Sequence, residues 1–351
     1  MPLTLRSATS ALALSCAGLL AASALVGVAP VEPAAAQSDA GLQNWLTGVR
    51  TQAIAAGVQA RTFDAVAPTL VYSPKTVSYD YAEPGNPNAP LPDFAPYRDR
   101  HVDAARINRG RAKYASLRPL LSRIERQTGV PEEIMVAIYG HETNYGGYTG
   151  DFDLLNSLAS LAYAGRRPEL FTGEFIAALK LLDQGVPRER LKGSWAGATG
   201  YPQFLPSVWL TTAVDGDGDG DRNIWGNEVD ALASIANYFV LAGWKPNVKW
   251  GVSAAVPISL DRTALANRTP SPRCPRTHER QSRWLSIAEW KRLGVVPAPG
   301  FADDELVTLI EPDGRGRTAY LLSSNYRAIL DYNCSTFYAL SVGLLAEAIA
   351  G

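Results

Sequence analysis

The sequence predicts an α+β fold that is mostly α-helical, with a small β element near the C-terminus. Up to residue 244, apolar residues recur mainly at helix-like spacing. Beyond it, short runs rich in Val, Leu, Ile and Thr surround the turn at residues 312–314. With 351 residues the chain can form a real hydrophobic core, and its formal net charge of -1 gives no electrostatic basis for binding nucleic acid.

The N-terminus has the layout of a cleaved secretory signal over residues 1–36. Arg6 precedes an apolar run at residues 11–28, and a Pro-rich stretch then ends in three alanines, with cleavage expected after Ala36. A retained membrane anchor is the alternative. Alanine and glycine make the run only weakly apolar, which favours cleavage and an exported protein.

The three cysteines predict one disulfide. Cys16 lies inside the apolar run, which continues past it, and Ala13 stands where a lipid-attachment motif needs an aliphatic residue. Lipid anchoring at Cys16 is therefore not expected. Removal of the signal leaves Cys274 and Cys334 in an oxidising compartment, where a disulfide is favoured over two buried free thiols.

Helices are expected through most of the chain, followed by strands and a closing helix. The predicted helices are 40–68, 102–128, one that opens at 129–133, 153–164, 168–184, 228–242 and 336–349, with an irregular stretch at 69–100 and strands at 256–260, 306–310 and 318–322. We divide the chain into a helical region at 37–128, a core at 129–244 and a final segment at 245–351 that completes the cleft.

Glu142 is the strongest candidate for a catalytic residue. On a helix that Gly146 and Gly147 end, Glu142 falls on one stripe with Ile134 and Ile138. A carboxylate in an apolar stripe is costly unless it is paired or protonated. A carboxyl that stays neutral near pH 7 suits a general acid, whereas a core carboxylate paired with an arginine is the structural alternative.

The neighbouring His141 does not make this helix a zinc-protease site. That motif requires a second histidine four residues after the first, and position 145 is Tyr.

Residues 193–207 form a second candidate site. Their glycines allow close approach of the backbone to a ligand, and Ser194 and Gln203 offer hydrogen bonds. Trp195, Tyr201 and Phe204 add flat apolar surfaces. This composition predicts a sugar-binding wall, with a tightly packed loop as the alternative.

Four motifs in order resemble the lytic murein transglycosylase B family. They lie at residues 129–146, 193–207, 234–239 and 332–340, and the resemblance extends from Tyr97 to the C-terminus. It implies a lysozyme-like helical core that acts on peptidoglycan glycan strands in the periplasm, as a monomer. Cell-wall synthesis proteins are further partners that the sequence leaves open.

The resemblance also implies an activity and its residues. The family cuts the β-1,4 bond between N-acetylmuramic acid and N-acetylglucosamine and leaves a 1,6-anhydro ring on the muramic acid. Its single catalytic glutamate falls on Glu142, and no second carboxylate or catalytic cofactor is expected. The sugar-contacting positions fall on Ser194, Gln203, Tyr238, Asn333 and Tyr338. A hydrolytic muramidase of the same fold and a non-catalytic wall-binding protein remain alternatives.

An acidic loop at 215–230 predicts a structural calcium site. Its alternating aspartates resemble an EF-hand loop, although Gly226 occupies the position of the usual final glutamate. A longer loop closed by Asp230 matches a calcium site of some members of the family. The expected ligands are Asp215, Asp217, Asp219, Asp221 and Asp230. An acidic turn without a cation is the alternative.

Overall fold

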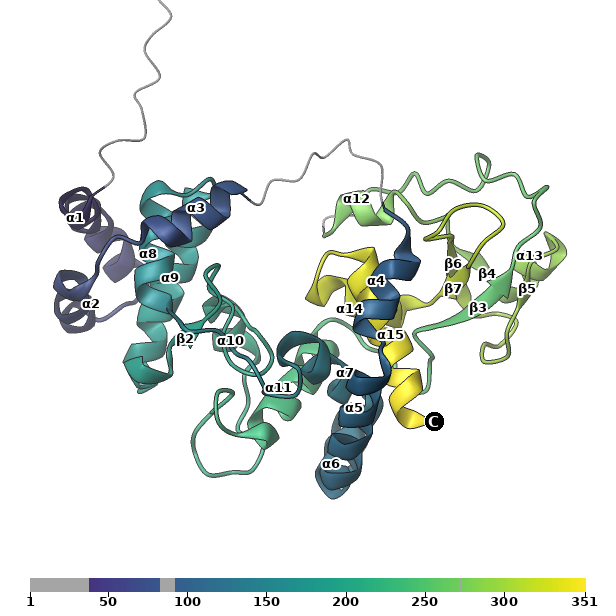
Figure 1. Ribbon diagram of the computed structural model, residues 1–351, viewed down its shortest axis with the longest axis horizontal. Helices are drawn as coiled ribbons and strands as arrows, with labels where there is room; N and C mark the ends of the chain where they lie inside the picture. Colours follow the sequence, from purple (N-terminus) through teal and green to yellow (C-terminus); the bar gives the residue numbers. More distant parts are fainter. Residues whose placement is uncertain (1–37, 83–91, 272) are drawn as a thin grey trace, which may run out of the picture. The chain divides into compact units, whose positions relative to one another are not determined.

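The computed structural model describes residues 38–82, 92–271 and 273–351, and these are mainly helical with a small sheet (Figure 1). The predicted signal at 1–36 and Cys16 lie outside the described residues. Within the described residues no single helix is long and apolar enough to cross a membrane, and only the bent pair formed by residues 324–332 and 336–350 meets that test by length and composition.

The elements follow one another in an order that places most helices before the sheet. The helices are α1 Asp39–Ala55, α2 Ala60–Val66, α3 Pro74–Ala82, α4 Phe94–His101, α5 Ala104–Ser116, α6 Arg118–Thr128, α7 Glu132–Thr143, α8 Leu154–Ala164, α9 Pro168–Asp183, α10 Pro206–Thr212, α11 Glu228–Leu241, α12 Pro275–His278, α13 Ile287–Arg292, α14 Ser324–Tyr332 and α15 Thr336–Ala350. The strands are β1 Phe152–Asp153, β2 Lys192–Gly193, β3 Gly251–Ala255, β4 Leu285–Ser286, β5 Val296–Pro297, β6 Leu306–Ile310 and β7 Tyr320–Leu322. Short 3₁₀ turns occur at Ala67–Thr69 and Arg188–Arg190.

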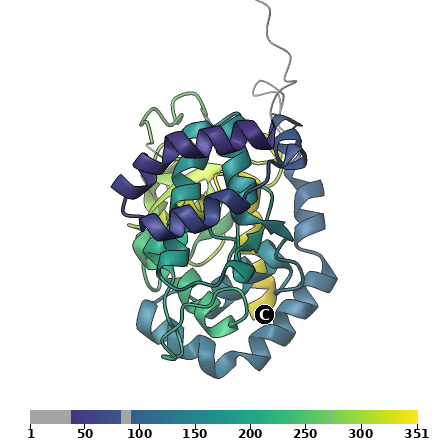
Figure 2. The same cartoon turned by 90° about the vertical axis from the view of Figure 1, so that its left-hand side faces the viewer.

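Helix α7 is enclosed by α5, α6, α11 and α15, all of which contact it. Its residues from Ile134 to Gly140 are buried, so the helix is covered on nearly every side. A second helical core surrounds α8 and α9, against which α1 and α2 pack (Figures 1 and 2). Both cores draw on segments from both sides of the predicted boundary at residue 128.

Two small sheets complete the fold. The larger is antiparallel, with strand order β4-β6-β7-β3-β5, and its register places Leu309 opposite Leu321. Its side chains pack around Trp290 in a third core. The smaller sheet pairs Phe152 of β1 with Gly193 of β2, which fixes the start of the glycine-rich loop beside α8.

Four predicted elements were wrong in their bounds. The helix expected at 40–68 is two helices and a 3₁₀ turn, because the chain leaves the helical path at Gly57, which has a positive φ. The helix expected at 102–128 is two helices, because it breaks at Leu117 and α6 restarts with a proline in its first turn, where the missing N–H costs nothing. The stretch 69–100 contains α3 and α4 rather than only irregular chain. The strand expected at 256–260 lies earlier, at β3, because residues 251–255 find hydrogen-bonding partners in β7 and β5.

The predicted disulfide is confirmed. Cys274 and Cys334 are bonded, with Cα atoms 5.2 Å apart and a sequence separation of 60 residues. The bond ties the turn between α14 and α15 to the segment that precedes α12. It thereby restrains Asn333, the residue next to Cys334, which is exposed.

Replacing both bonded cysteines, Cys274→Ser with Cys334→Ser, should lower the free energy of unfolding by about 2–4 kcal/mol, since the bond closes a long loop in the unfolded chain. Urea denaturation of the oxidised wild type and of the double variant measures the difference. Reductant should lower the wild-type midpoint and leave that of the double variant unchanged. Equal midpoints for the two oxidised proteins would contradict a stabilising role.

Candidate functional site

Glu142 occupies the last turn of α7 and receives a hydrogen bond from α15. The hydroxyl of Tyr338 donates to Glu142 Oε1 over 2.5 Å. Ile138 and Ile134, one and two turns earlier on the predicted stripe, are fully and almost fully buried. The helix thus carries its apolar stripe into the core and presents the carboxyl at its end, where the side chain remains partly exposed.

The surroundings of Glu142 hold it near half protonation at neutral pH. Burial raises the pKa of Glu142 to about 7, and the hydrogen bond from Tyr338 acts in the opposite direction. Among the described residues, no other carboxylate shifts the pKa of Glu142. The site contains one carboxyl that is available as an acid and, after losing its proton, as a base.

Tyrosines surround this carboxyl. The pKa values of Tyr97, Tyr332 and Tyr338 are all raised, chiefly by burial, and the negative charge of Glu142 raises each one further. All three rings therefore stay neutral near pH 7. A neutral hydroxyl donates to the carboxylate without competing for its proton.

A close packing contact sets the end of α7. A Cβ on Gly140 would lie 2.5 Å from the ring of Tyr145, so only glycine allows this tyrosine to pack there. Asn144 and Tyr145 are in the left-handed conformation, and the Tyr145 hydroxyl donates to the carbonyl oxygen of Arg106 over 2.9 Å. The helix consequently ends at Thr143, before the glycines that were expected to end it.

His141 links α7 to α15 without adding charge beside Glu142. Its Nε2 lies 2.7 Å from Ser341 Oγ, and that hydroxyl donates to the carbonyl oxygen of Tyr338 over 2.9 Å. His141 must therefore donate from Nε2, which assigns its tautomer. Burial, helped by Arg106 and His101, lowers the pKa of His141 to about 3. The sequence drew attention to His141 but gave no sign of this contact.

Three tyrosine rings continue from Glu142 toward the glycine-rich loop. The rings of Tyr338 and Tyr332 are stacked at 6.5 Å, and the rings of Tyr332 and Tyr238 are 4.6 Å apart. The Tyr332 hydroxyl donates to the carbonyl oxygen of Pro202 over 2.7 Å, and Tyr238 donates to that of Asp331 over 2.7 Å. Tyr332 was not among the predicted site residues, although it begins the fourth sequence motif.

The glycine-rich loop is fixed largely by its own polar groups. Gln203, which is in the left-handed conformation, donates from Nε2 to the carbonyl oxygens of Thr149 (3.1 Å) and Gly200 (2.9 Å). Its amide oxygen accepts no hydrogen bond within the described part of the chain. Ser194 Oγ accepts from the backbone N–H of Ala198 over 3.1 Å. Gln203 thus presents a rigidly held acceptor.

This loop also contacts α7 directly. The hydroxyl of Thr143, next to Glu142, donates to the carbonyl oxygen of Tyr201 over 3.3 Å, and the rings of Tyr139 and Tyr201 are 5.3 Å apart. The structure therefore joins Glu142, Tyr338, Tyr238 and the loop that carries Gln203 through a chain of contacts. Ser194 and Asn333 form no hydrogen bond with Glu142 among the described residues.

The structure brings together three of the five predicted metal ligands. Carboxylate oxygens of Asp215, Asp217 and Asp219 lie within 4.8 Å of one another, and all three side chains are exposed. Asp221 instead forms an ion pair with Arg190 at 2.5 Å. Asp230 is fully buried and holds the two ends of the loop together. Its carboxylate accepts from the backbone N–H groups of Gly216 (2.8 Å) and Asn223 (2.7 Å), near the two ends of the acidic stretch.

Tyr338→Phe should raise the pKa of Glu142 above its wild-type value of about 7. The lost hydrogen bond stabilises the charged carboxylate, so its removal favours the protonated form. Titration of the Glu142 carboxyl carbon by NMR measures the change. Tyr332→Phe is the matched control, because its hydroxyl bonds to Pro202 instead. A midpoint that falls in Tyr338→Phe, or that shifts equally in both variants, would contradict this assignment.

Comparison with known proteins gives a consistent result. Residues 41–347 match the family model described as the transglycosylase SLT domain. The chain is 32% identical over 267 residues to the membrane-bound lytic murein transglycosylase B of Escherichia coli K12, which covers 75% of this chain and 69% of that protein.

Solved structures agree over most of the chain. SltB3 of Pseudomonas aeruginosa in complex with NAG-anhNAM-pentapeptide is similar with a TM-score of 0.79 and 37% identity, covering 90% of this chain and 80% of that one. Slt35 of Escherichia coli in complex with calcium gives a TM-score of 0.70 at 27% identity, covering 88% and 92%.

Proposed function

Because the chain belongs to the transglycosylase SLT domain family, we propose that it cleaves peptidoglycan between N-acetylmuramic acid and N-acetylglucosamine and forms a 1,6-anhydro product. The family match confirms the resemblance inferred from the four sequence motifs, and the lysozyme-like helical fold agrees with it. The chain is accordingly a lytic transglycosylase that acts on peptidoglycan. The bond, the product and the catalytic residue are our proposal.

A single carboxyl performs both proton transfers in the proposed mechanism. Protonated Glu142 first donates its proton to the oxygen that leaves the muramic acid carbon. The resulting carboxylate then removes the proton from the C6 hydroxyl of the same sugar, and that oxygen attacks the anomeric carbon. The hydroxyl is part of the substrate, which gives its attack a large proximity advantage over a water molecule.

The observation that carries this proposal is the position of Glu142 at the end of α7, where Tyr338 donates a hydrogen bond to it. Burial raises its pKa to about 7, and no second carboxylate among the described residues influences that pKa. Most glycosidases place two carboxyl groups on either side of the bond, one as acid and one as nucleophile or base. A lone carboxyl near half protonation suits a reaction in which one residue gives a proton and takes one back. The hydrogen bond from Tyr338 supports the charged intermediate form.

We assign sugar contacts to Ser194, Gln203, Tyr238, Asn333 and Tyr338. Gln203 supports this assignment through its fixed amide, and the tyrosines through flat ring surfaces next to Glu142. The Pseudomonas SltB3 structure contains NAG-anhNAM-pentapeptide, which supports a glycan strand as the ligand of this chain as well.

Glu142→Gln should lower the rate of peptidoglycan digestion at least about 100-fold, since it removes the general acid and base. The assay is chromatography of soluble products from purified sacculi. Glu169→Gln on α9 is the matched control, because that glutamate is exposed and should leave the rate unchanged. Wild-type products that end in reducing muramic acid instead of the 1,6-anhydro form would indicate a hydrolase. Digestion by Glu142→Gln at the wild-type rate would show that Glu142 is not the catalytic acid and base.

We also propose that Asp215, Asp217 and Asp219 hold a structural calcium ion. Three close carboxylates repel one another, and calcium prefers such oxygen ligands. The calcium in Escherichia coli Slt35 supports this proposal. Asp230 holds the loop through backbone bonds, and Asp221 joins the site only if its ion pair with Arg190 opens. Calcium would hold the segment between α10 and α11 in place and take no part in bond cleavage.

Added calcium should raise the melting temperature, and a chelator should lower it, because an ion that binds only the folded state stabilises it by mass action. Differential scanning calorimetry measures both shifts. Asp217→Asn should reduce the effect, whereas Asp303→Asn, at another exposed aspartate, should retain it. If neither calcium nor the chelator changed the melting temperature of the wild type, the loop would not bind a metal ion.

The cellular location follows from the substrate class. A protein that acts on the cell wall works outside the cytoplasm, and the Escherichia coli relative is described as membrane-bound. We propose a periplasmic enzyme released by cleavage after Ala36.

A further inference from the structure

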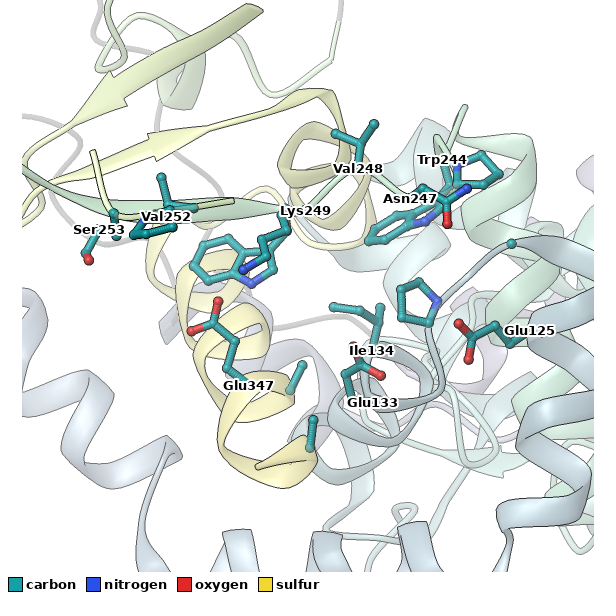
Figure 3. Close-up of a pocket in the computed structure, with 18 residues that line it drawn as sticks. Glu125, Glu133, Ile134, Trp244, Asn247, Val248, Lys249, Val252, Ser253 and Glu347 are labelled. Atoms are coloured by element: carbon teal, nitrogen blue, oxygen red, sulfur yellow. The ribbon is translucent and has the colours of Figure 1, made fainter. Parts of the chain in front are cut away.

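A large cavity lies at the opposite end of α7 from Glu142. Its volume is about 750 Å³, and it is lined by the end of α6, the start of α7, α15 and the segment that leads into β3 (Figure 3). Glu133 lines it, nine residues before Glu142 on the same helix. That separation places the two side chains about 14 Å apart along the axis and on opposite sides of the helix. The cavity is therefore separate from the catalytic site.

Three carboxylates line this cavity and outnumber its one basic side chain. Glu125, Glu133 and Glu347 come from three different helices, and among the described residues none has a Lys, Arg or His nitrogen within 4 Å. The neighbouring Glu132 shows the contrast, because Arg118 pairs with it at 2.7 Å. Lys249 is the one basic side chain in the lining, so the formal charge of the lining is negative.

This negative charge is compensated only in part. Burial raises the pKa of Glu133, and the nearby Glu125 and Glu132 raise it further, whereas a backbone N–H and Arg118 lower it. Burial also raises the pKa of Glu347, while Lys249 partly offsets that effect. A cation in the cavity would relieve the repulsion between these carboxylates.

Two tryptophans provide the apolar part of the wall. Trp244 and Trp250 are only 7% and 6% exposed, and both line the cavity. A Cβ on Gly343 would lie 2.4 Å from the Trp250 ring, so α15 holds this indole firmly in place. The indole N–H of Trp244 is buried and has no acceptor among the described residues. Indole surfaces pack well against methylene groups and attract ammonium ions.

We propose that this cavity binds a short peptide segment that carries a primary ammonium group on an aliphatic side chain. The ammonium group lies among Glu125, Glu133 and Glu347, and the methylene chain packs against Trp250. A volume of about 750 Å³ matches that of sites which enclose a ligand of this size.

If the proposed function holds, the natural source of this ammonium group is a peptide attached to the glycan. The Pseudomonas SltB3 complex shows that such glycans carry peptides. Because Glu133 and Glu142 face opposite sides of α7, the peptide in the cavity would belong to a strand other than the one being cut. The cavity would then hold the enzyme on the wall during cleavage.

Binding of Nα-acetyl-lysine methylamide, followed by the indole N–H signals in NMR, tests the site. Nα,Nε-diacetyl-lysine methylamide has nearly the same shape without the charge, and it should bind at least about ten-fold more weakly. Glu133→Gln with Glu347→Gln should weaken the lysine probe by a similar factor, and Glu169→Gln should not. Equal affinity for the two probes, or an unchanged affinity in the double variant, would overturn the proposal. Thermal melting of the double variant checks that it is folded.

A second measurement identifies the source and separates it from catalysis. Glu142→Gln should sediment with purified sacculi, and chemical acetylation of the sacculus amines should reduce the bound fraction. Adding Glu133→Gln and Glu347→Gln to this variant should remove the sensitivity to acetylation. If acetylation has no effect, the peptide of the wall is not the ligand, whatever the activity of Glu142 proves to be.

Discussion

The hydrogen bond between Tyr338 and Glu142 depends on the packing of α7 against α15, and the site depends on that bond. Burial alone favours the protonated carboxyl, and the tyrosine moderates the effect so that the pKa stays near 7. The bond requires the two helix ends to meet at a fixed distance. Ser341 and His141 form a second connection between the same helices and secure this alignment.

Other parts of the fold maintain this alignment from outside. The disulfide at Cys334 restrains the turn that precedes α15. The close contact between Gly140 and Tyr145 ends α7 immediately after Glu142, which keeps the carboxyl at the edge of the core. The middle of α7 is thus buried, and its last turn holds the carboxyl in a fixed position. Such preorganisation suits the proposed proton transfers, because little rearrangement is needed when a substrate binds.

Both ends of α7 carry a carboxyl group that has no ion-pair partner among the described residues. At the C-terminal end Glu142 meets tyrosines, and at the N-terminal end Glu133 lines a cavity with Glu125 and Glu347. The buried middle of the helix separates the two sites. One helix therefore carries the proposed catalytic carboxyl at one end and a charged cavity at the other.

The sequence by itself determined the main helices, the position of Glu142 and the disulfide. Apolar spacing, a proline at the start of a helix and the number of cysteines can be read from the sequence, so predictions based on them do not require the tertiary contacts. It misplaced β3, because residues 251–255 are small and gain strand structure only from their partners in β5 and β7. Only the tertiary structure decided that Tyr338, almost 200 residues away, hydrogen-bonds to Glu142 and that Asp221 pairs with Arg190. The physical reason is that a carboxyl group takes its pKa and its partners from whatever the fold places beside it, and spacing along the chain does not encode those neighbours.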